Sequence, residues 1–254
     1  MLRNKQMHWT EEFFDEYYLK SSHYLTRAEQ TEKEVDFLLK HVEITKESAI
    51  LDLACGYGRH AIALAKRGYK NVSGLDLTEL YIKMAREKAQ GLAIPPHFVQ
   101  GDMSDFEEEK QYDLIYSFFS SMFYYDDKHN LDIIHRIYKG LKRDGYFVID
   151  YFNPLYFLKI NKKKDWHITD DDYLILEKYA HNPLSGMITD ERLIITPEGK
   201  RIKRIFHVRD YTPAELRFHF ENIGFEILNV YGDFDGNEYN IDATRQIFVA
   251  RKPE

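Results

Sequence analysis

The sequence contains one cysteine, Cys55, among 254 residues. It therefore cannot form an intramolecular disulfide or a zinc site built from several cysteines, which fits a reducing compartment. Long apolar runs are also missing: no stretch approaches the length of a membrane span, and the first eight residues have no apolar core of signal-peptide length. These absences predict a cytoplasmic protein with no membrane segment.

Positive charge is scarce relative to negative charge. The chain has 35 lysines and arginines against 42 aspartates and glutamates, a net charge of -7. Because nucleic-acid binders usually carry a clustered positive surface, we expect no nucleic-acid partner. The eleven histidines show no metal-ligand spacing, so we expect no metal site. The length suits one large α/β domain, or such a domain with an insertion, and the sequence leaves a homodimer open.

The segment from Ile50 to His60 joins an apolar strand to a glycine turn and a helix. Asp52 lies in the strand, and Gly56 and Gly58 follow in the turn. Glycine allows a sharp turn and a close approach of a ligand to the backbone. A helix beginning at Arg59 would present its unpaired N–H groups to the same place. This order of elements is typical of nucleotide-binding proteins.

The chain on either side of this turn alternates between strands and helices, which predicts a parallel, doubly wound sheet. Two helices precede it, at 10–21 and 27–41, and we expect residues 1–44 to form an N-terminal helical cap. The expected strands are 50–53, 71–75, 97–100, 112–118 and 146–151, with helices at 59–67, 78–90 and 128–141.

After the fifth strand the pattern changes to β-rich runs separated by turn residues. The runs 173–180, 187–195 and 201–208 predict an antiparallel meander inserted at 161–209, which we interpret as a substrate lid. A capping box at Thr212 then begins a helix that stops at Gly224. Two last strands, 225–231 and 245–251, return to the α/β domain, which we place at 45–160 and 210–254.

Three acids stand near the carboxyl ends of consecutive strands, where open α/β sheets bind their ligands. Asp76 lies 20 residues beyond Gly56 and could accept hydrogen bonds from both hydroxyls of a ribose. Asp102 could accept one from an adenine amino group, with the backbone N–H of Met103 on a ring nitrogen. Asp52 stands beside the glycine turn and would attract a cationic group rather than a phosphate.

Two other functions fit part of this pattern. The run from Gly56 to Ala61 also satisfies the dinucleotide pattern of nicotinamide-dependent oxidoreductases. Against that, Asp52 would repel a pyrophosphate, and the dinucleotide pattern does not use an acid after the third strand. A partner-binding module that has lost its chemistry is a further alternative, which the intact acids and glycines disfavour.

The same residues resemble the class I S-adenosylmethionine-dependent methyltransferases. The resemblance covers about 45–152 and 211–252 and implies a Rossmann-like, seven-stranded, mostly parallel sheet whose last strand is antiparallel, with helices on both faces. Within that family the chain is similar to amino-sugar N-methyltransferases and glycine N-methyltransferase, which also place extra strands after strand 5. Tyr124 stands where some sugar enzymes have a histidine, so a histidine base is in doubt. The matching segments are 51–58, 74–77, 101–103, 112–116, 141–147 and the terminal strand pair.

The resemblance implies an enzyme that transfers a methyl group from S-adenosylmethionine to a small amine, sugar or acid by in-line displacement. We expect Tyr124 and Tyr125 to line the acceptor pocket, with Tyr17 or Tyr18 and Trp166 nearby. The residues expected to bind the cofactor are Tyr24, Arg27, Asp52, Ala54, Gly56, Asp76, Leu77, Asp102, Met103 and Phe118.

Overall fold

The computed structural model describes residues 9–22 and 26–253 and divides the chain into two compact units. The α/β unit comprises Ala28–Asn161 and Asp210–Glu254, and the meander unit comprises Met1–Arg27 and Lys162–Arg209. This grouping differs from a cap that covers all of residues 1–44. The third helix belongs to the α/β unit because it packs on the helix after the glycine turn, whereas the first helix, at 9–13, packs on one of the inserted strands.

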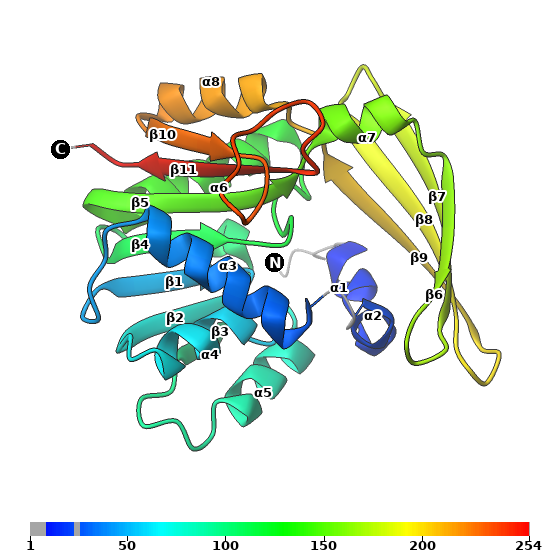
Figure 1. Cartoon of the computed structure of the whole chain (residues 1–254), viewed down its shortest axis with the longest axis horizontal. Coiled ribbons are helices and arrows are strands. Elements are labelled where there is room, and N and C mark those ends of the chain that lie inside the picture. Colours follow the sequence, from blue (N-terminus) through cyan, green and yellow to red (C-terminus); the bar gives the residue numbers. More distant parts are fainter. Residues whose placement is uncertain (1–8, 23–25, 254) are drawn as a thin grey trace, which may run out of the picture. The chain divides into compact units, whose positions relative to one another are not determined.

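The α/β unit is built on a seven-stranded sheet with the order β10-β11-β5-β4-β1-β2-β3 (Figure 1). The β11 strand is antiparallel to both of its neighbours, and the other pairs are parallel, so the predicted fold is confirmed. The strands are β1 (Ala49–Leu53), β2 (Asn71–Asp76), β3 (His97–Gln100), β4 (Tyr112–Ser117), β5 (Leu141–Phe152), β10 (Glu226–Tyr231) and β11 (Arg245–Arg251).

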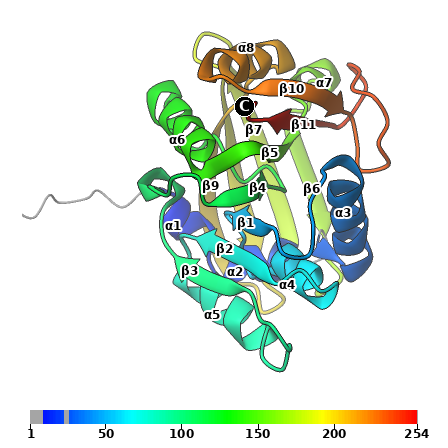
Figure 2. The same ribbon diagram turned by 90° about the vertical axis from the view of Figure 1, so that its left-hand side faces the viewer.

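Helices cover both faces of this sheet, with α3 on one side and α6 on the other (Figure 2). Apolar residues of α3, α4 and α5 share one core cluster with the central strands, whereas α6 packs against α8. The Thr212 capping box begins α8, as predicted, and Asn153 caps a helix, α7, that the sequence did not predict. The helices are α3 (Ala28–His41), α4 (Arg59–Lys66), α5 (Glu79–Lys88), α6 (Asp127–Gly140), α7 (Pro154–Ile160) and α8 (Pro213–Ile223), with the 3-10 helix η2 (Met103–Asp105).

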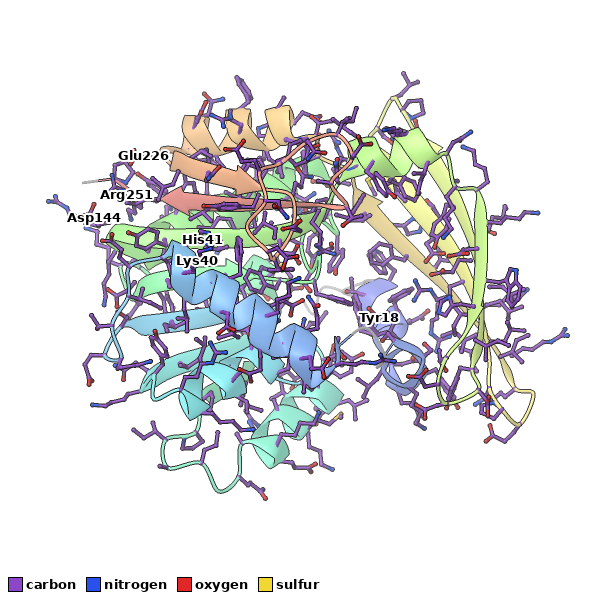
Figure 3. All side chains as sticks on the ribbon, in the orientation of Figure 1. Tyr18, Lys40, His41, Asp144, Glu226 and Arg251 are labelled. Carbon is purple, nitrogen blue, oxygen red and sulfur yellow. The ribbon has the colours of Figure 1, made fainter. Side chains whose placement is uncertain are left out.

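One surface ion-pair group lies at the amino ends of the parallel strands, the edge of the sheet opposite to the predicted ligand site. Arg251, at the end of β11, pairs with Glu226 at 2.6 Å and with Asp144 at 3.8 Å. Figure 3 shows these three side chains together at that end. All three are at least a third exposed, so the group is typical of solvated surface charge.

The meander unit consists of two short helices and a four-stranded antiparallel sheet. The expected single helix at 10–21 is wrong: Asp15 accepts hydrogen bonds from the backbone N–H groups of Tyr17 and Tyr18, at 3.0 and 2.9 Å, and so begins a second helix. The aromatic rings of Trp9 and Phe13 pack on β9. The elements are α1 (Trp9–Phe13), α2 (Glu16–Ser22), β6 (Lys164–Ile168), β7 (Leu174–Asn182), β8 (Met187–Ile195) and β9 (Arg201–Arg209).

Three of the four strands in this sheet were predicted, and β6 was not. The β6 strand is short and begins at the end of the basic run 159–164, a composition typical of a solvated loop. Trp166 in β6 is 67% exposed, whereas its neighbours Asp165 and His167 are half-buried on the opposite face. Within the described residues, no helix has both the length and the apolar content needed to span a membrane.

Candidate functional site

The turn after β1 is held in a left-handed backbone conformation. Ala54, Gly56 and Gly58 have φ angles of 60°, 55° and 76°. At Gly58 a Cβ would lie 2.5 Å from the ring of Phe98, so no other residue fits without displacing that ring. The turn therefore lies tightly against the sheet, and α4 begins directly after it. The predicted cofactor residues Ala54 and Gly56 both belong to this turn.

Asp76 ties the end of β2 to the same turn. Its Oδ2 accepts a hydrogen bond from the Gly56 N–H at 2.8 Å, and its Oδ1 accepts one from the Thr78 N–H at 2.9 Å. Burial raises the pKa of Asp76, and these two backbone donors oppose the shift. Each oxygen keeps a lone pair for a ribose hydroxyl. Leu77, between Asp76 and Thr78, accepts a hydrogen bond from Gln100 through its carbonyl at 3.3 Å.

The Asp52 carboxylate is buried, and among the described residues one of its two oxygens has no hydrogen-bond partner. Its side chain lies beside Tyr116 of β4 in the strand register, and it is only 2% exposed. Within the part of the chain that the structure describes, its Oδ2 has no hydrogen-bond partner. Burial raises the pKa of Asp52 to about 7, while the Tyr116 hydroxyl and the Arg59 charge oppose the shift. A cationic ligand group at this oxygen would stabilise the ionised form.

Asp102 contacts Tyr125, a residue that the sequence predicts in the acceptor pocket. Its Oδ1 accepts the Ser104 N–H at 2.8 Å and so caps η2, which begins at Met103. The Tyr125 hydroxyl donates to both carboxylate oxygens, each at 3.0 Å. Burial and the Asp102 charge raise the pKa of Tyr125 above its usual range. Tyr125, expected in the acceptor pocket, is therefore placed at the acid that we expect to bind adenine.

The loop after β4 is strained and firmly anchored. Phe119, Ser120 and Phe123 have φ angles of 65°, 57° and 71°, which are unfavourable for residues with a Cβ. The buried Asp150 carboxylate accepts the Phe119 N–H at 2.8 Å and forms a two-point ion pair with Arg245. Strain held by surrounding contacts is common at functional sites, so this loop is a good candidate for substrate binding.

Both tyrosines of this loop are held by hydrogen bonds. The Tyr124 hydroxyl donates to the Ser120 carbonyl at 3.1 Å, and Tyr124 is 9% exposed. The Asn130 side chain accepts from the Tyr125 N–H at 3.2 Å and donates to its carbonyl at 2.7 Å. Their proposed contact with the acceptor stays a prediction.

Phe118, Arg27 and Tyr24 are the remaining residues that the sequence predicts to bind the cofactor. Phe118 is 3% exposed, and its ring packs on those of His60 and Tyr116, at 5.3 and 5.2 Å between centroids. Arg27 lies in the meander unit and pairs with Asp170 at 2.7 Å. Tyr24 lies outside the described residues. Their roles in cofactor binding stay predictions.

The sequence did not point to a buried polar cluster between α3 and α4. Glu34 of α3 is 3% exposed, and its Oε2 contacts Arg59 and the His60 Nε2, the latter at 2.7 Å. Thr31 accepts a hydrogen bond from Arg59 Nη1 at 2.9 Å. The available signal was an acid on the apolar stripe of the helix, between Thr31 and Leu38, where a carboxylate needs a buried partner.

Among the described residues, three side chains of the meander unit bring possible metal-ligand atoms within 4.8 Å of one another, namely Asp165, His167 and Glu177. Glu177 is already paired with Arg192 at 2.6 Å, and Asp165 with a lysine. We do not interpret the group as a metal site, and the expected absence of a metal stays a prediction.

Comparison with known proteins agrees with the geometry around the glycine turn. Residues 50–145 match a family model described as a methyltransferase domain. The chain is 25% identical over 215 residues to YqeM of Bacillus subtilis (strain 168), which is named provisionally as a methyltransferase, covering 82% of this chain and 86% of that protein.

Two solved structures share the fold over most of the chain. An S-adenosylmethionine-dependent methyltransferase from Clostridium acetobutylicum has a TM-score of 0.80 and 19% identity, covering 93% of this chain and 99% of that one. CalS10, an amino pentose methyltransferase from Micromonospora echinaspora solved with S-adenosylmethionine, has a TM-score of 0.68 and 18% identity, covering 94% and 98%.

Proposed function

We propose that this chain, a class I S-adenosylmethionine-dependent methyltransferase whose domain match covers residues 50–145, methylates a small-molecule amine. The cofactor is S-adenosylmethionine. The acceptor class is our proposal, narrowed from the amines, sugars and acids that the sequence leaves open.

The observation that carries the cofactor assignment is the buried Asp52 oxygen beside the glycine turn, for which the described residues supply no partner. A cationic amino-acid tail would satisfy it, whereas a pyrophosphate would be repelled. Asp76 has lone pairs for the ribose, and Asp102 Oδ2, which accepts from the Tyr125 hydroxyl, has a second lone pair for the adenine amino group. The residues present thus fit an adenosyl amino acid better than a nicotinamide dinucleotide.

When bound, S-adenosylmethionine supplies an electrophilic methyl group on a positively charged sulfur. In the proposed transfer the amine lone pair forms the new carbon–nitrogen bond. The electron pair of the broken carbon–sulfur bond stays on sulfur, giving a neutral thioether, and the methylated amine releases a proton to solvent. The protein contributes mainly alignment and exclusion of water, which supply on the order of 7–11 kcal/mol in well-oriented reactions. A dedicated base is not required.

An amine acceptor agrees with the aromatic character of the loop after β4. Aromatic faces stabilise a nearby cation by roughly 0.5–2 kcal/mol. Two proteins of the same fold, CalS10 and KedS8, are named as an amino pentose methyltransferase and a sugar N-methyltransferase. The net charge of -7 disfavours a nucleic-acid acceptor.

Calorimetry with S-adenosylhomocysteine and with NADH tests the cofactor assignment. We expect the thioether product to bind and NADH not to bind. Binding of NADH in preference to S-adenosylhomocysteine would overturn the assignment and favour the oxidoreductase alternative.

A metabolite screen that detects S-adenosylhomocysteine release then tests the acceptor class. We expect turnover with small amines, and turnover restricted to hydroxyl or carboxyl acceptors would contradict the proposal. With a true acceptor in hand, Tyr124→Phe and Tyr125→Phe test the acceptor loop. Unchanged turnover in both variants would remove these tyrosines from the acceptor site. The lid role of residues 161–209, the cytoplasmic location and a homodimer stay predictions.

A further inference from the structure

The sheet of the meander unit, with the strand order β6-β7-β8-β9, has one buried face and one exposed face (Figure 1). On the buried side Ile175, Ile194 and Ile202 pack together with Tyr17. The residues between them point to the opposite side, which we call the outer face, because successive side chains of a strand alternate. The solvated face of an antiparallel sheet normally carries polar residues.

Large apolar side chains form a block on the outer face of β6, β7 and β8. The strand register places two rows of three such residues next to each other, Trp166–Leu176–Leu193 and Ile168–Leu174–Ile195. Trp166 and Ile168 are 67% and 61% exposed. A contiguous apolar patch with a polar rim is typical of an interaction site in a soluble protein.

Charged residues surround this apolar block on two sides. Lys203 and Arg201 of β9 end the two apolar rows. A third row of the outer face runs Lys164–Lys178–Glu191–Ile205. Within it the Lys178 Nζ lies 3.3 Å from the Glu191 carboxylate, and both side chains are more than half exposed. The outer face thus presents both signs of charge beside its apolar centre.

The arrangement is complementary to itself about a two-fold axis that runs along the strands between β7 and β8. When two copies pack face to face about this axis, β7 lies over β8 of the second copy and β6 lies over β9. Each row then lies over the same row of the second copy in reverse order. The axis therefore brings unlike strands, and not identical residues, into contact.

The contacts that this axis creates are favourable in all three rows. Lys178 meets Glu191 of the second copy, so opposite charges face each other twice in the dimer. Trp166 meets Lys203 of the second copy, which allows a contact between a cation and an aromatic face. Apolar residues of β7 meet apolar residues of β8 in both apolar rows. A partner with a single sign of charge would match the lysines or Glu191, but not both.

We propose that the outer face is the interface of a symmetric homodimer, with β7 of each copy over β8 of the other. The sheet extends about 19 Å across its four strands and about 30 Å along the nine-residue β7, roughly 570 Å² in projection. Standard interfaces bury about 800 Å² per partner, so we expect a reversible dimer and not an obligate one. This proposal is independent of the proposed function.

Analytical ultracentrifugation of the full chain over about 1–100 μM tests the dimer. We expect the weight-average mass to rise with concentration toward twice that of the monomer. Trp166→Glu should weaken self-association at least about 10-fold, because it places an unpaired carboxylate in the apolar centre of the interface. Phe218→Glu is the matched control: Phe218 is 62% exposed but lies on α8 of the α/β unit, and this variant should dimerise as wild type.

Charge reversal tests the position of the axis. In Lys178→Glu the acids at 178 and 191 would face each other across the interface, and in Glu191→Lys the lysines would do so. Each variant alone should self-associate at least about 10-fold more weakly than wild type. An equimolar mixture of the two should dimerise close to the wild-type level, because each interface contact then joins opposite charges. Contacts within one copy are the same in the mixture, so recovery reports the contact between copies.

Three results would overturn the proposal. The first is a wild-type mass that stays monomeric over the whole concentration range, whatever other partner the face binds. The second is a dimer that Trp166→Glu leaves unchanged, which would place the interface elsewhere. The third is a mixture of the two charge variants that associates no better than either alone. Far-UV circular dichroism confirms that each variant is folded, and the charge variants decide the question if Trp166→Glu does not fold.

Discussion

Replacing Arg245 by methionine should destabilise the α/β unit far more than the same replacement of Arg251, at the other end of β11. Arg245 makes a two-point ion pair with Asp150, whose side chain is 1% exposed, and it donates to the Ser120 hydroxyl at 3.2 Å. Removing one partner of a buried pair costs about 3–5 kcal/mol because the other charge remains buried. Arg245 is itself 25% exposed, so we expect a loss near the lower end, about 3 kcal/mol.

The Arg251→Met variant is the control, because it shows how much unfolding free energy is lost when an exposed ion pair on the same strand is removed. Its partners Glu226 and Asp144 are about half exposed, and exposed pairs contribute roughly 0.2–1 kcal/mol. The free energy of unfolding should be measured by urea titration with far-UV circular dichroism. Tryptophan fluorescence is unsuitable, because both tryptophans, Trp9 and Trp166, belong to the meander unit.

The pH dependence gives a second, independent check. Burial already raises the pKa of Asp150, and Arg245 opposes that shift. Without Arg245 the folded-state pKa rises further above its unfolded value, so the carboxyl is protonated on folding at low pH. Its burial is then tolerated in acid, and stability is lost as the pH rises through the folded-state pKa. The difference between Arg245→Met and wild type should therefore be larger at pH 8 than at pH 5.

Two results would refute this reasoning. One is a loss in Arg245→Met no greater than that in Arg251→Met at pH 8. The other is a loss that does not change between pH 5 and pH 8. If the buried charge is the cause, adding Asp150→Asn to Arg245→Met should recover part of the lost stability.

Two further predictions concern Asp52 and the two glycines that flank α4, Gly58 and Gly68. Because burial raises the pKa of Asp52 to about 7, the thermal midpoint of the ligand-free protein should fall as the pH rises through that value, and S-adenosylhomocysteine should bind more tightly over the same range. Asp52→Asn should lose both trends, and their persistence would assign them to another group. Gly68→Ala, at φ 87° with nothing within 4 Å, should cost about 1–2 kcal/mol in a urea titration. Gly58→Ala should cost roughly 1–3 kcal/mol more because it overpacks against Phe98, and equal losses would show that the ring moves freely.

The α/β architecture and its acids could be predicted because their signals are local. Each of Asp52, Asp76 and Asp102 stands near the end of an apolar run that is followed by glycine or a helix cap, and parallel strands bring such ends to one edge. The Gly56 to Asp76 hydrogen bond is the direct result of that crossover. These local signals did not show which other side chains of the protein contact the three acids.

Contacts between distant segments explain most of what the sequence did not reveal. Tyr125 follows an aromatic pattern typical of a pocket wall, yet its hydroxyl donates to Asp102, which lies in the turn after β3. The Asp150–Arg245 pair joins residues 95 positions apart, and neither position is marked by local periodicity. The break at Asp15 is a different case: aromatic residues on both sides continue the helical spacing, so only the cap geometry identifies the boundary.

The meander unit is assembled from two stretches of chain that are made at very different times. Asp15 and Arg204, which pair in the finished unit, are 189 positions apart. At a synthesis rate of about 5–20 residues per second, the first helices emerge roughly 10–40 s before their strand. During that interval the side chains of Trp9 and Phe13 lack the Phe206 ring on which they pack in the folded unit. Newly made chains should therefore depend on chaperones most strongly before β9 leaves the ribosome.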